Sequence, residues 1–234
     1  MIAGALIACK AEAMGPRSLA IQKRTVGGRM LRHSHNHAYA ALVLRGGYVE
    51  AGNCGRHCVG PGEVLLHGCF DAHQDEFGPG GADILNLPCA AHTQTATGRV
   101  HDADAIVRLA EYDSHAAGIA LAAALLPANN SLHDWPDLLA AALRRNEVTS
   151  LARWAEAHGM SPASLSQGFA KAYGVAPKRF RLEQRAARAA KAILAGERPT
   201  ATLALELGFA DQAHMSRAVR RLTGASPRAL QRCA

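Results

Sequence analysis

Apolar positions in the last third of the chain follow the spacing of α-helices, and the whole pattern occurs twice. Residues 151–180 are echoed about fifty positions later by residues 200–230. In each copy a short apolar stripe is followed by a glycine, a second apolar stripe, another glycine and a proline. Glycine ends helices because it adopts positive φ, and proline favours the first turn of the next helix. The repeat therefore predicts two helix-turn-helix units, at about residues 149–173 and 200–223.

The second helix of each unit separates into an apolar stripe and a polar face. The stripes consist of Leu165, Phe169 and Ala172 in the first copy and of Met215, Val219 and Leu222 in the second. The other faces carry hydroxyl, amide, imidazole and cationic groups, a mixture that suits base edges and phosphates. We therefore expect these residues to bind DNA: Ala163, Ser164, Gln167 and Lys171 in the first copy, and Gln212, Ala213, His214, Arg217, Arg220 and Arg221 in the second.

The first hundred residues have a different pattern, in which short β-favouring runs are separated by glycine-rich breaks. This spacing predicts an all-β sandwich or barrel over residues 1–100. The expected strands are residues 39–44, 48–50, 57–59, 63–67 and 83–87.

A helical connector is predicted between the two halves, over residues 101–130. Residues 102–126 are rich in alanine and leucine and end at a turn-like segment, 127–130. An apolar helix in this place either pairs with its twin in a homodimer or packs back on the β domain. Residues 134–145 then form the entry helix of an all-α domain at 131–234.

Charge is distributed unevenly along the chain. Residues 1–143 carry 10 Lys and Arg against 13 Asp and Glu, whereas residues 144–234 carry 16 against 6. The net charge of +7 and the pI near 9.4 therefore come from the C-terminal part alone. Basic charge concentrated on one domain indicates a phosphate-bearing partner such as DNA.

The second copy of the repeat carries a family resemblance. The segment from Leu203 through Gly208-Phe209 to Arg217, followed by Gly224 and Pro227, closely resembles the signature of AraC/XylS-type transcriptional regulators. The resemblance implies that the second helix of each unit enters the major groove of double-stranded DNA, and that RNA polymerase and a small-molecule effector are further partners. The first copy departs from the family pattern, because Gln167 stands where the family usually carries arginine.

A histidine pattern in the β region resembles the two short motifs of cupin barrels, the usual sensor domain of this family. The pattern consists of His35 and His37, then Pro61-Gly62 and His73. Histidines two residues apart on a strand face one side, so three imidazoles could line an effector pocket or hold a divalent metal such as Zn, Fe, Ni or Mn.

The glutamate that metal-binding cupins carry after the first histidine pair is missing, because residues 40–42 are Ala, Ala and Leu. Metal binding, an organic effector and purely structural histidines therefore remain open. Further polar candidates in this region are Cys54, His57, Cys58, His67, Cys69, Cys89 and His92.

Together these patterns predict a DNA-binding transcriptional regulator with a cupin-like sensor, not an enzyme. The competing hypothesis is a cupin metalloenzyme, such as a dioxygenase or isomerase, with a basic helical tail. A cytoplasmic location is expected, because the six cysteines form no dense disulfide framework and no positive charge precedes the apolar start of the chain.

Overall fold

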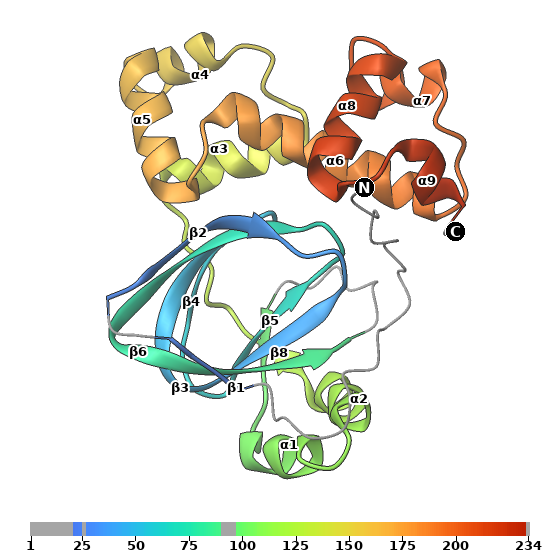
Figure 1. The fold of residues 1–234 in the computed structure, drawn as a ribbon. Helices are drawn as coiled ribbons and strands as arrows, with labels where there is room; N and C mark the ends of the chain where they lie inside the picture. The colour runs from blue at the N-terminus through green and yellow to red at the C-terminus, as the bar shows by residue number, and fades with distance from the viewer. Residues whose placement is uncertain (1–20, 25–26, 90–96, 233–234) are drawn as a thin grey trace, which may run out of the picture.

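The computed structural model describes residues 21–24, 27–89 and 97–232. In it an N-terminal antiparallel β domain is followed by a C-terminal helical domain (Figure 1). The start of the chain, with its apolar segment, and His92 lie outside the described residues. The predicted fold class, a β domain followed by an all-α domain, is confirmed.

The β domain is built from one antiparallel sheet that curls round on itself (Figure 1). Its central strands run in the order β1-β6-β3-β5-β7-β8, with β2 paired to β6 and β4 paired to β3. The strands are β1 (Ile21–Arg24), β2 (Arg29–Ser34), β3 (Tyr39–Gly52), β4 (Gly55–Val59), β5 (Glu63–His67), β6 (Ala72–Pro88), β7 (Thr97–Arg99) and β8 (Leu126–Pro127).

Two of these strands are longer than the sequence predicts, because glycines expected to end strands lie inside them. The register of β3 against β6 shifts on both sides of Gly46, which marks irregular pairing there. Gly46 has φ +68°, and a Cβ at this position would lie 2.0 Å from the carbonyl oxygen of Gly81. Glycine therefore allows two backbones to approach closely here, rather than forming the turn that we predicted.

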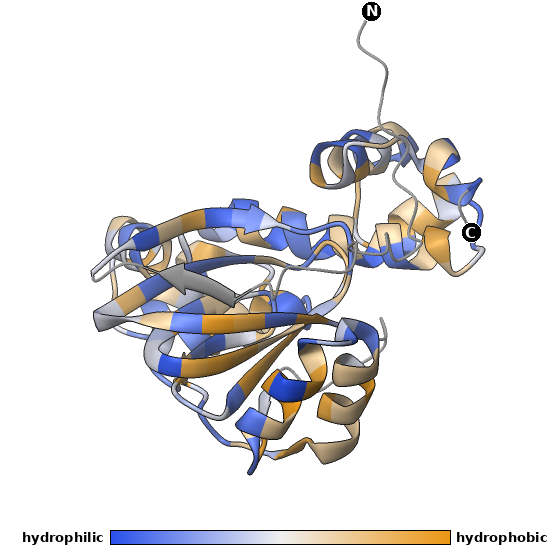
Figure 2. Cartoon of the chain, turned by 60° about the horizontal axis from the view of Figure 1, so that its bottom comes forward, coloured by the Kyte–Doolittle hydropathy of each residue, from blue (hydrophilic) through white to orange (hydrophobic). Residues whose placement is uncertain are grey.

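Alternate residues of β3 face two different apolar clusters. Ala41 and Val43 belong to a cluster inside the curled sheet, whereas Ala40 and Leu42 belong to one on its outer face. Figure 2 shows apolar stretches, drawn in orange, along strands of the sheet. Because successive side chains of a strand point to opposite faces, the unbroken apolar run at residues 40–43 serves both cores.

The connector is two helices, α1 (Ala103–Ala110) and α2 (Ser114–Ala124), rather than the single helix expected. Asp113 separates them, because its side chain caps the start of α2. Ile106, Ala117 and Leu121 are buried against the outer face of the sheet. Of the two arrangements left open, the connector therefore packs back on the β domain, while pairing in a homodimer stays a prediction.

The C-terminal domain contains both predicted helix-turn-helix units. Its helices are α3 (Trp135–Arg144), α4 (Leu151–Ala157), α5 (Pro162–Tyr173), α6 (Pro177–Leu194), α7 (Ala201–Glu206), α8 (Gln212–Thr223) and α9 (Pro227–Gln231). Within the described part of the chain, no helix is both long and apolar enough to cross a bilayer.

The second helices of the two units have the same kinds of N-terminal and C-terminal caps, as the repeat predicts. Side chains of Ser161 and Asp211 cap the starts of α5 and α8, and Gly174 and Gly224 end these helices with φ +73° and +76°. Each unit also has its own apolar cluster, and α6 contributes to both, so that this helix joins the units (Figure 1).

Candidate DNA-binding surface and ligand site

The residues expected to bind DNA lie on α5 and α8. Nine of the ten are exposed and His214 is half-buried, with its ring edge-on to Phe209. Beneath them the stripe residues Leu165, Phe169, Met215 and Val219 are buried, so that the polar faces are held in place by packed helices. Exposed polar residues on the second helix of a helix-turn-helix are the ones that reach base edges.

The C-terminal end of α5 is bound to the β domain. Arg29 donates to the carbonyl of Lys171 at 3.1 Å, Gln74 to that of Ala172 at 2.9 Å, and Arg32 to that of Tyr173 at 3.3 Å. The last carbonyls of a helix have no partner within the helix, and cations near them interact favourably with the helix dipole. The β domain therefore supplies the C-terminal cap of the first unit's second helix.

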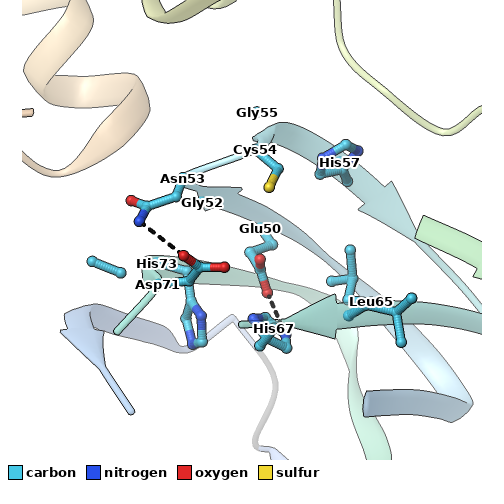
Figure 3. Close-up of a pocket in the computed structure, with 12 residues that line it drawn as sticks. Glu50, Gly52, Asn53, Cys54, Gly55, His57, Leu65, His67, Asp71 and His73 are labelled. Carbon is cyan, nitrogen blue, oxygen red and sulfur yellow. Dashed lines mark hydrogen bonds and ion pairs between the residues drawn. The ribbon is translucent and has the colours of Figure 1, made fainter. Parts of the chain in front are cut away.

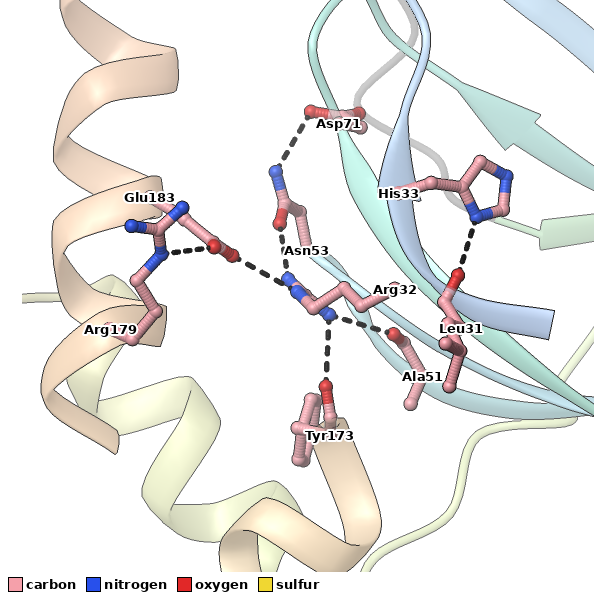
Figure 4. Close-up of polar contacts among 9 residues, drawn as sticks. All are labelled: Leu31, Arg32, His33, Ala51, Asn53, Asp71, Tyr173, Arg179 and Glu183. Atoms are coloured by element: carbon pink, nitrogen blue, oxygen red, sulfur yellow. Dashed lines mark hydrogen bonds and ion pairs between the residues drawn. The ribbon is translucent and has the colours of Figure 1, made fainter. Parts of the chain in front are cut away.

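Arg32 is the centre of this contact (Figure 4). Its guanidinium bonds the Glu183 carboxylate of α6 at 3.0 Å, the Ala51 carbonyl at 3.1 Å and the Asn53 side chain at 3.2 Å. Arg179 also bonds Glu183, at 2.7 Å. Burial lowers the pKa of Arg32, while Glu183 opposes this shift, so the buried charge is paired.

A loop of the β domain enters the core of the second unit. Phe70 is 2% exposed and belongs to the same apolar cluster as residues of α6, α7, α8 and α9. Its backbone N–H donates to the carbonyl of His35 at 2.7 Å. The next residue, Asp71, accepts hydrogen bonds from Asn53 at 3.3 Å and from Lys191 of α6 at 3.1 Å. The β domain thus contacts both units directly, and not only through the connector.

The histidines chosen from the sequence are partly brought together. His35 is half-buried and His73 buried, with ring centroids 5.5 Å apart. His37 is exposed, and its Nδ1 lies 3.0 Å from the Asn36 side chain. His33 completes a group with His35 and His73 in which one ligand atom from each residue lies within 4.8 Å of the others.

A second group lies deeper in the β domain and shares His73. It consists of Glu50, His67 and His73, all buried, with ligand atoms again within 4.8 Å of one another. The Glu50 carboxylate is 3.4 Å from Nε2 of His67, and the two groups face each other in Figure 3. Gly52 leaves room for this arrangement, because a Cβ there would lie 2.9 Å from Oε1 of Glu50 and 3.6 Å from Cβ of His73.

Burial disfavours the charged forms of the groups in this deeper site. It lowers the pKa of His67 to about 3 and moves the pKa of His73 in the same direction. Burial, and then the charge of Asp75, raises the pKa of Glu50 well above its usual value. These shifts all favour the uncharged forms of Glu50, His67 and His73.

A small cavity adjoins these groups (Figure 3). Its volume is about 10 Å³, which is about the space of one water molecule. The lining residues include Glu50, Cys54, His67, Asp71 and His73. The space suits a single small ligand such as an ion.

Glu50 and His33 were not among the residues singled out from the sequence, and His67 was named only as a further polar candidate. Glu50 lies two residues after Tyr48 on β3, and residues two apart on a strand share one face. Tyr48 belongs to the inner apolar cluster, so strand periodicity was the signal that pointed Glu50 inward. His67 follows Leu65 of the same cluster by two positions. For His33, the signal was a second pair at the same spacing, His33 with His35.

Sequence comparison identifies the C-terminal domain. Residues 154–232 match the family model of a helix-turn-helix domain. The match begins in α4 and ends just beyond α9, so it spans both units. No curated protein sequence matches the chain.

Comparison with solved structures gives weaker likenesses. A transcriptional regulator from Chromobacterium violaceum with an AraC-type DNA-binding domain is 24% identical over 40% of this chain and 86% of its own, with a TM-score of 0.37. ToxT from Vibrio cholerae is 11% identical over 92% of this chain and 98% of its own, with a TM-score of 0.39. Oxalate decarboxylase from Bacillus subtilis is 14% identical over 50% of this chain and 36% of its own, with a TM-score of 0.28. TM-scores this low establish neither a common fold nor a common function.

The doubled unit, its exposed polar faces and the family match define a class of protein. The chain is a DNA-binding transcriptional regulator. Its C-terminal part, residues 154–232, is a helix-turn-helix domain.

Proposed function

We propose that the β domain senses a small ligand and controls how the two helix-turn-helix units meet DNA. The observation that carries this proposal is the set of three bonds from Arg29, Arg32 and Gln74 to consecutive carbonyls at the end of α5. In this scheme residues 1–100 form the effector-binding domain, 101–130 the connector and 131–234 the DNA-binding domain.

The ligand site and the contact with α5 use neighbouring residues of the same strands. Arg32 precedes His33 on β2, Gln74 follows His73 on β6, and Ala51 follows Glu50 on β3. Successive strand residues point to opposite faces, so one member of each pair lies toward the histidine cluster and the other toward the helices. A ligand that moves these strands would therefore change the support of α5.

Such a shift changes the affinity for DNA only if the ligand binds one arrangement better than the other. The contacts of Phe70 and Asp71 extend the same coupling to the second unit. We infer a cytoplasmic regulator that acts on double-stranded DNA, with RNA polymerase and a second copy of the chain as further partners.

On the DNA side, α5 and α8 are the helices that we place in the major groove. Arg217, exposed in the middle of α8, is assigned to a guanine, because arginine pairs bidentately with O6 and N7 of that base. Lys171, Arg220 and Arg221, toward the helix ends, are assigned to phosphates. The other six residues, Ala163, Ser164, Gln167, Gln212, Ala213 and His214, lie in the first half of each helix, where base contacts concentrate.

The size of the cavity favours a regulatory over a catalytic role for the β domain. A dioxygenase or isomerase must hold an organic substrate beside its metal, and ligand pockets for such molecules measure roughly 300–1,000 Å³. A cavity of about 10 Å³ has no room for one. We therefore assign no catalytic residue.

The base contact of Arg217 can be tested on its own. Arg217→Ala should weaken binding to the preferred site by about 1–3 kcal/mol and relax the preference at one base pair. Arg221→Ala and Lys171→Ala should weaken binding to all sequences more evenly, since they remove phosphate contacts. Gel-shift titrations on the preferred site and on a series of single-base variants measure both effects. An equal loss on every sequence for all three variants would exclude Arg217 from base reading.

A further inference from the structure

We propose that the β domain binds one divalent transition-metal ion, with Glu50, His67 and His73 as its protein ligands. This inference rests on the proposed function, because the ion would be the ligand to which the regulator responds. Of the three histidines expected to hold a metal, only His73 is in this set; His67 was a further polar candidate, and the carboxylate comes from Glu50 in the second half of β3.

The donor set is one that such metals accept. Two imidazoles and a carboxylate bind Zn²⁺ and neighbouring divalent metals and leave further positions for water. The 3.4 Å between Glu50 and Nε2 of His67 equals the roughly 3.4 Å between two ligands of a tetrahedral ion with bonds of about 2.1 Å. All three ligand atoms lie within 4.8 Å of one another, so small side-chain shifts would complete the site.

His73 has an unused ring nitrogen. Its Nε2 lies 3.1 Å from Nε2 of His33, whereas its Nδ1 is buried and without a hydrogen-bond partner among the described residues. A buried polar atom without a partner is costly, and a bound ion would satisfy it. The ring is also almost fully buried, at 3% exposure, so it is not a solvated surface histidine.

The cavity beside these residues fits the same occupant. A volume of about 10 Å³ accommodates a single ion or water but not an organic effector. The lining is also rich in metal-binding groups, with Glu50 and Asp71 as its two acidic residues and His67 and His73 among its imidazoles. The size of the cavity and the chemistry of its lining residues therefore both favour a cation.

The outer group of His33, His35 and His73 is the weaker choice. His33 and His35 are half-buried, and the short contact between His33 and His73 already occupies one nitrogen of each ring. The inner group is buried throughout and includes the carboxylate that the outer one lacks. Substitutions can separate the two groups, because only His73 belongs to both.

The test uses the full-length protein after removal of metals with a chelator. Zn²⁺ is titrated by calorimetry, and Co²⁺ by its visible absorption. We expect one ion per chain, with Glu50→Gln and His67→Gln each lowering the affinity at least tenfold. His35→Ala should change it less than threefold. The matched controls are Glu76→Gln, on the exposed side of β6, and His37→Ala, and neither should change the affinity.

Thermal melts of each metal-free variant show whether it folds. If His67→Gln does not fold, Glu50→Gln provides the test, because it replaces the carboxyl group with an amide of nearly the same shape. Unchanged affinity in Glu50→Gln would overturn the proposal, as would a loss of binding in His35→Ala equal to that in His67→Gln. Strong sulfur-to-cobalt absorption would also overturn it, since it would place the ion on the neighbouring cysteines.

The same samples distinguish this inference from the proposed function. A folded protein that binds DNA but takes up no Zn²⁺ or Co²⁺ would refute the metal site and leave the regulator intact. A protein that binds one ion at Glu50 and His67, with the same DNA affinity in both forms, would support the metal site and contradict sensing.

Discussion

Replacing Phe70 with alanine should destabilise the protein by about 3–5 kcal/mol, the cost of deleting a fully buried aromatic side chain. The ring is 2% exposed and lies in the apolar cluster of the second helix-turn-helix unit, although the residue belongs to the β domain. Its loss leaves a cavity between the two domains. Denaturant unfolding of the variant and the parent protein measures the difference.

Alanine is the informative substitution at this position because Phe70 has φ +65°. Alanine keeps the Cβ and therefore the backbone strain, so the change reports only the loss of the ring, whereas glycine would also relieve strain. Leu31→Ala is the control, since Leu31 is 77% exposed and should change stability by less than about 0.5 kcal/mol. A similar small effect of Phe70→Ala would show that the loop does not hold the second unit.

Replacing Arg32 with methionine should cost about 3 kcal/mol, because it removes one partner of a buried ion pair and leaves the buried carboxylate poorly compensated. Glu183 would keep only Arg179, and the carbonyls of Ala51 and Tyr173 would lose a donor. Arg29→Met is the matched control. Arg29 also caps α5, but its ion pair with Glu76 is exposed and contributes at most about 1 kcal/mol.

A double-mutant cycle separates the pair from its surroundings. The combination of Arg32→Met with Glu183→Met should be less destabilising than the sum of the single changes, because no charge is then left buried alone. Equal unfolding free energies for Arg32→Met and Arg29→Met, or strict additivity in the cycle, would contradict the role of Arg32 as the main polar contact between the β domain and the helices.

The helical domain could be predicted closely because its signals are local. Caps such as Ser161 and Asp211, and the glycines that end α5 and α8, act within a few residues of the helix ends that they define. The apolar stripes follow from the helical period alone. The observed helices of the two units run over residues 151–173 and 201–223.

The β domain could be predicted in class but not in detail, because its decisive contacts are distant in sequence. Gly46 resembles a turn residue until Gly81 is placed against it, and the strand then continues through it. The direct contacts of the β domain with the helices, through Arg32 and Phe70, join residues more than a hundred positions apart. No periodicity in either segment indicates its partner.

The site formed by Glu50, His67 and His73 shows the same limit of prediction from sequence. The absence of a glutamate at residues 40–42 argued against a metal, yet Glu50 lies 3.4 Å from His67, which itself pairs with Tyr39 at the other end of β3. Strand periodicity could turn Glu50 inward, but only the pairing of β3 with β6 brings it to His73, and only the curling of the sheet brings it to His67.

Selection of binding sites from a randomised library of duplex DNA by the full-length protein tests the central claim most directly. We expect one preferred site with two specific segments about one helical turn apart, roughly 10 base pairs, because α5 and α8 each read a major groove. Repeating the selection with Arg217→Ala should erase the preference at one position in one segment and leave the other segment unchanged. Binding without sequence preference, or a preference that Arg217→Ala leaves intact in both segments, would contradict the assignment of these helices as the DNA-reading elements.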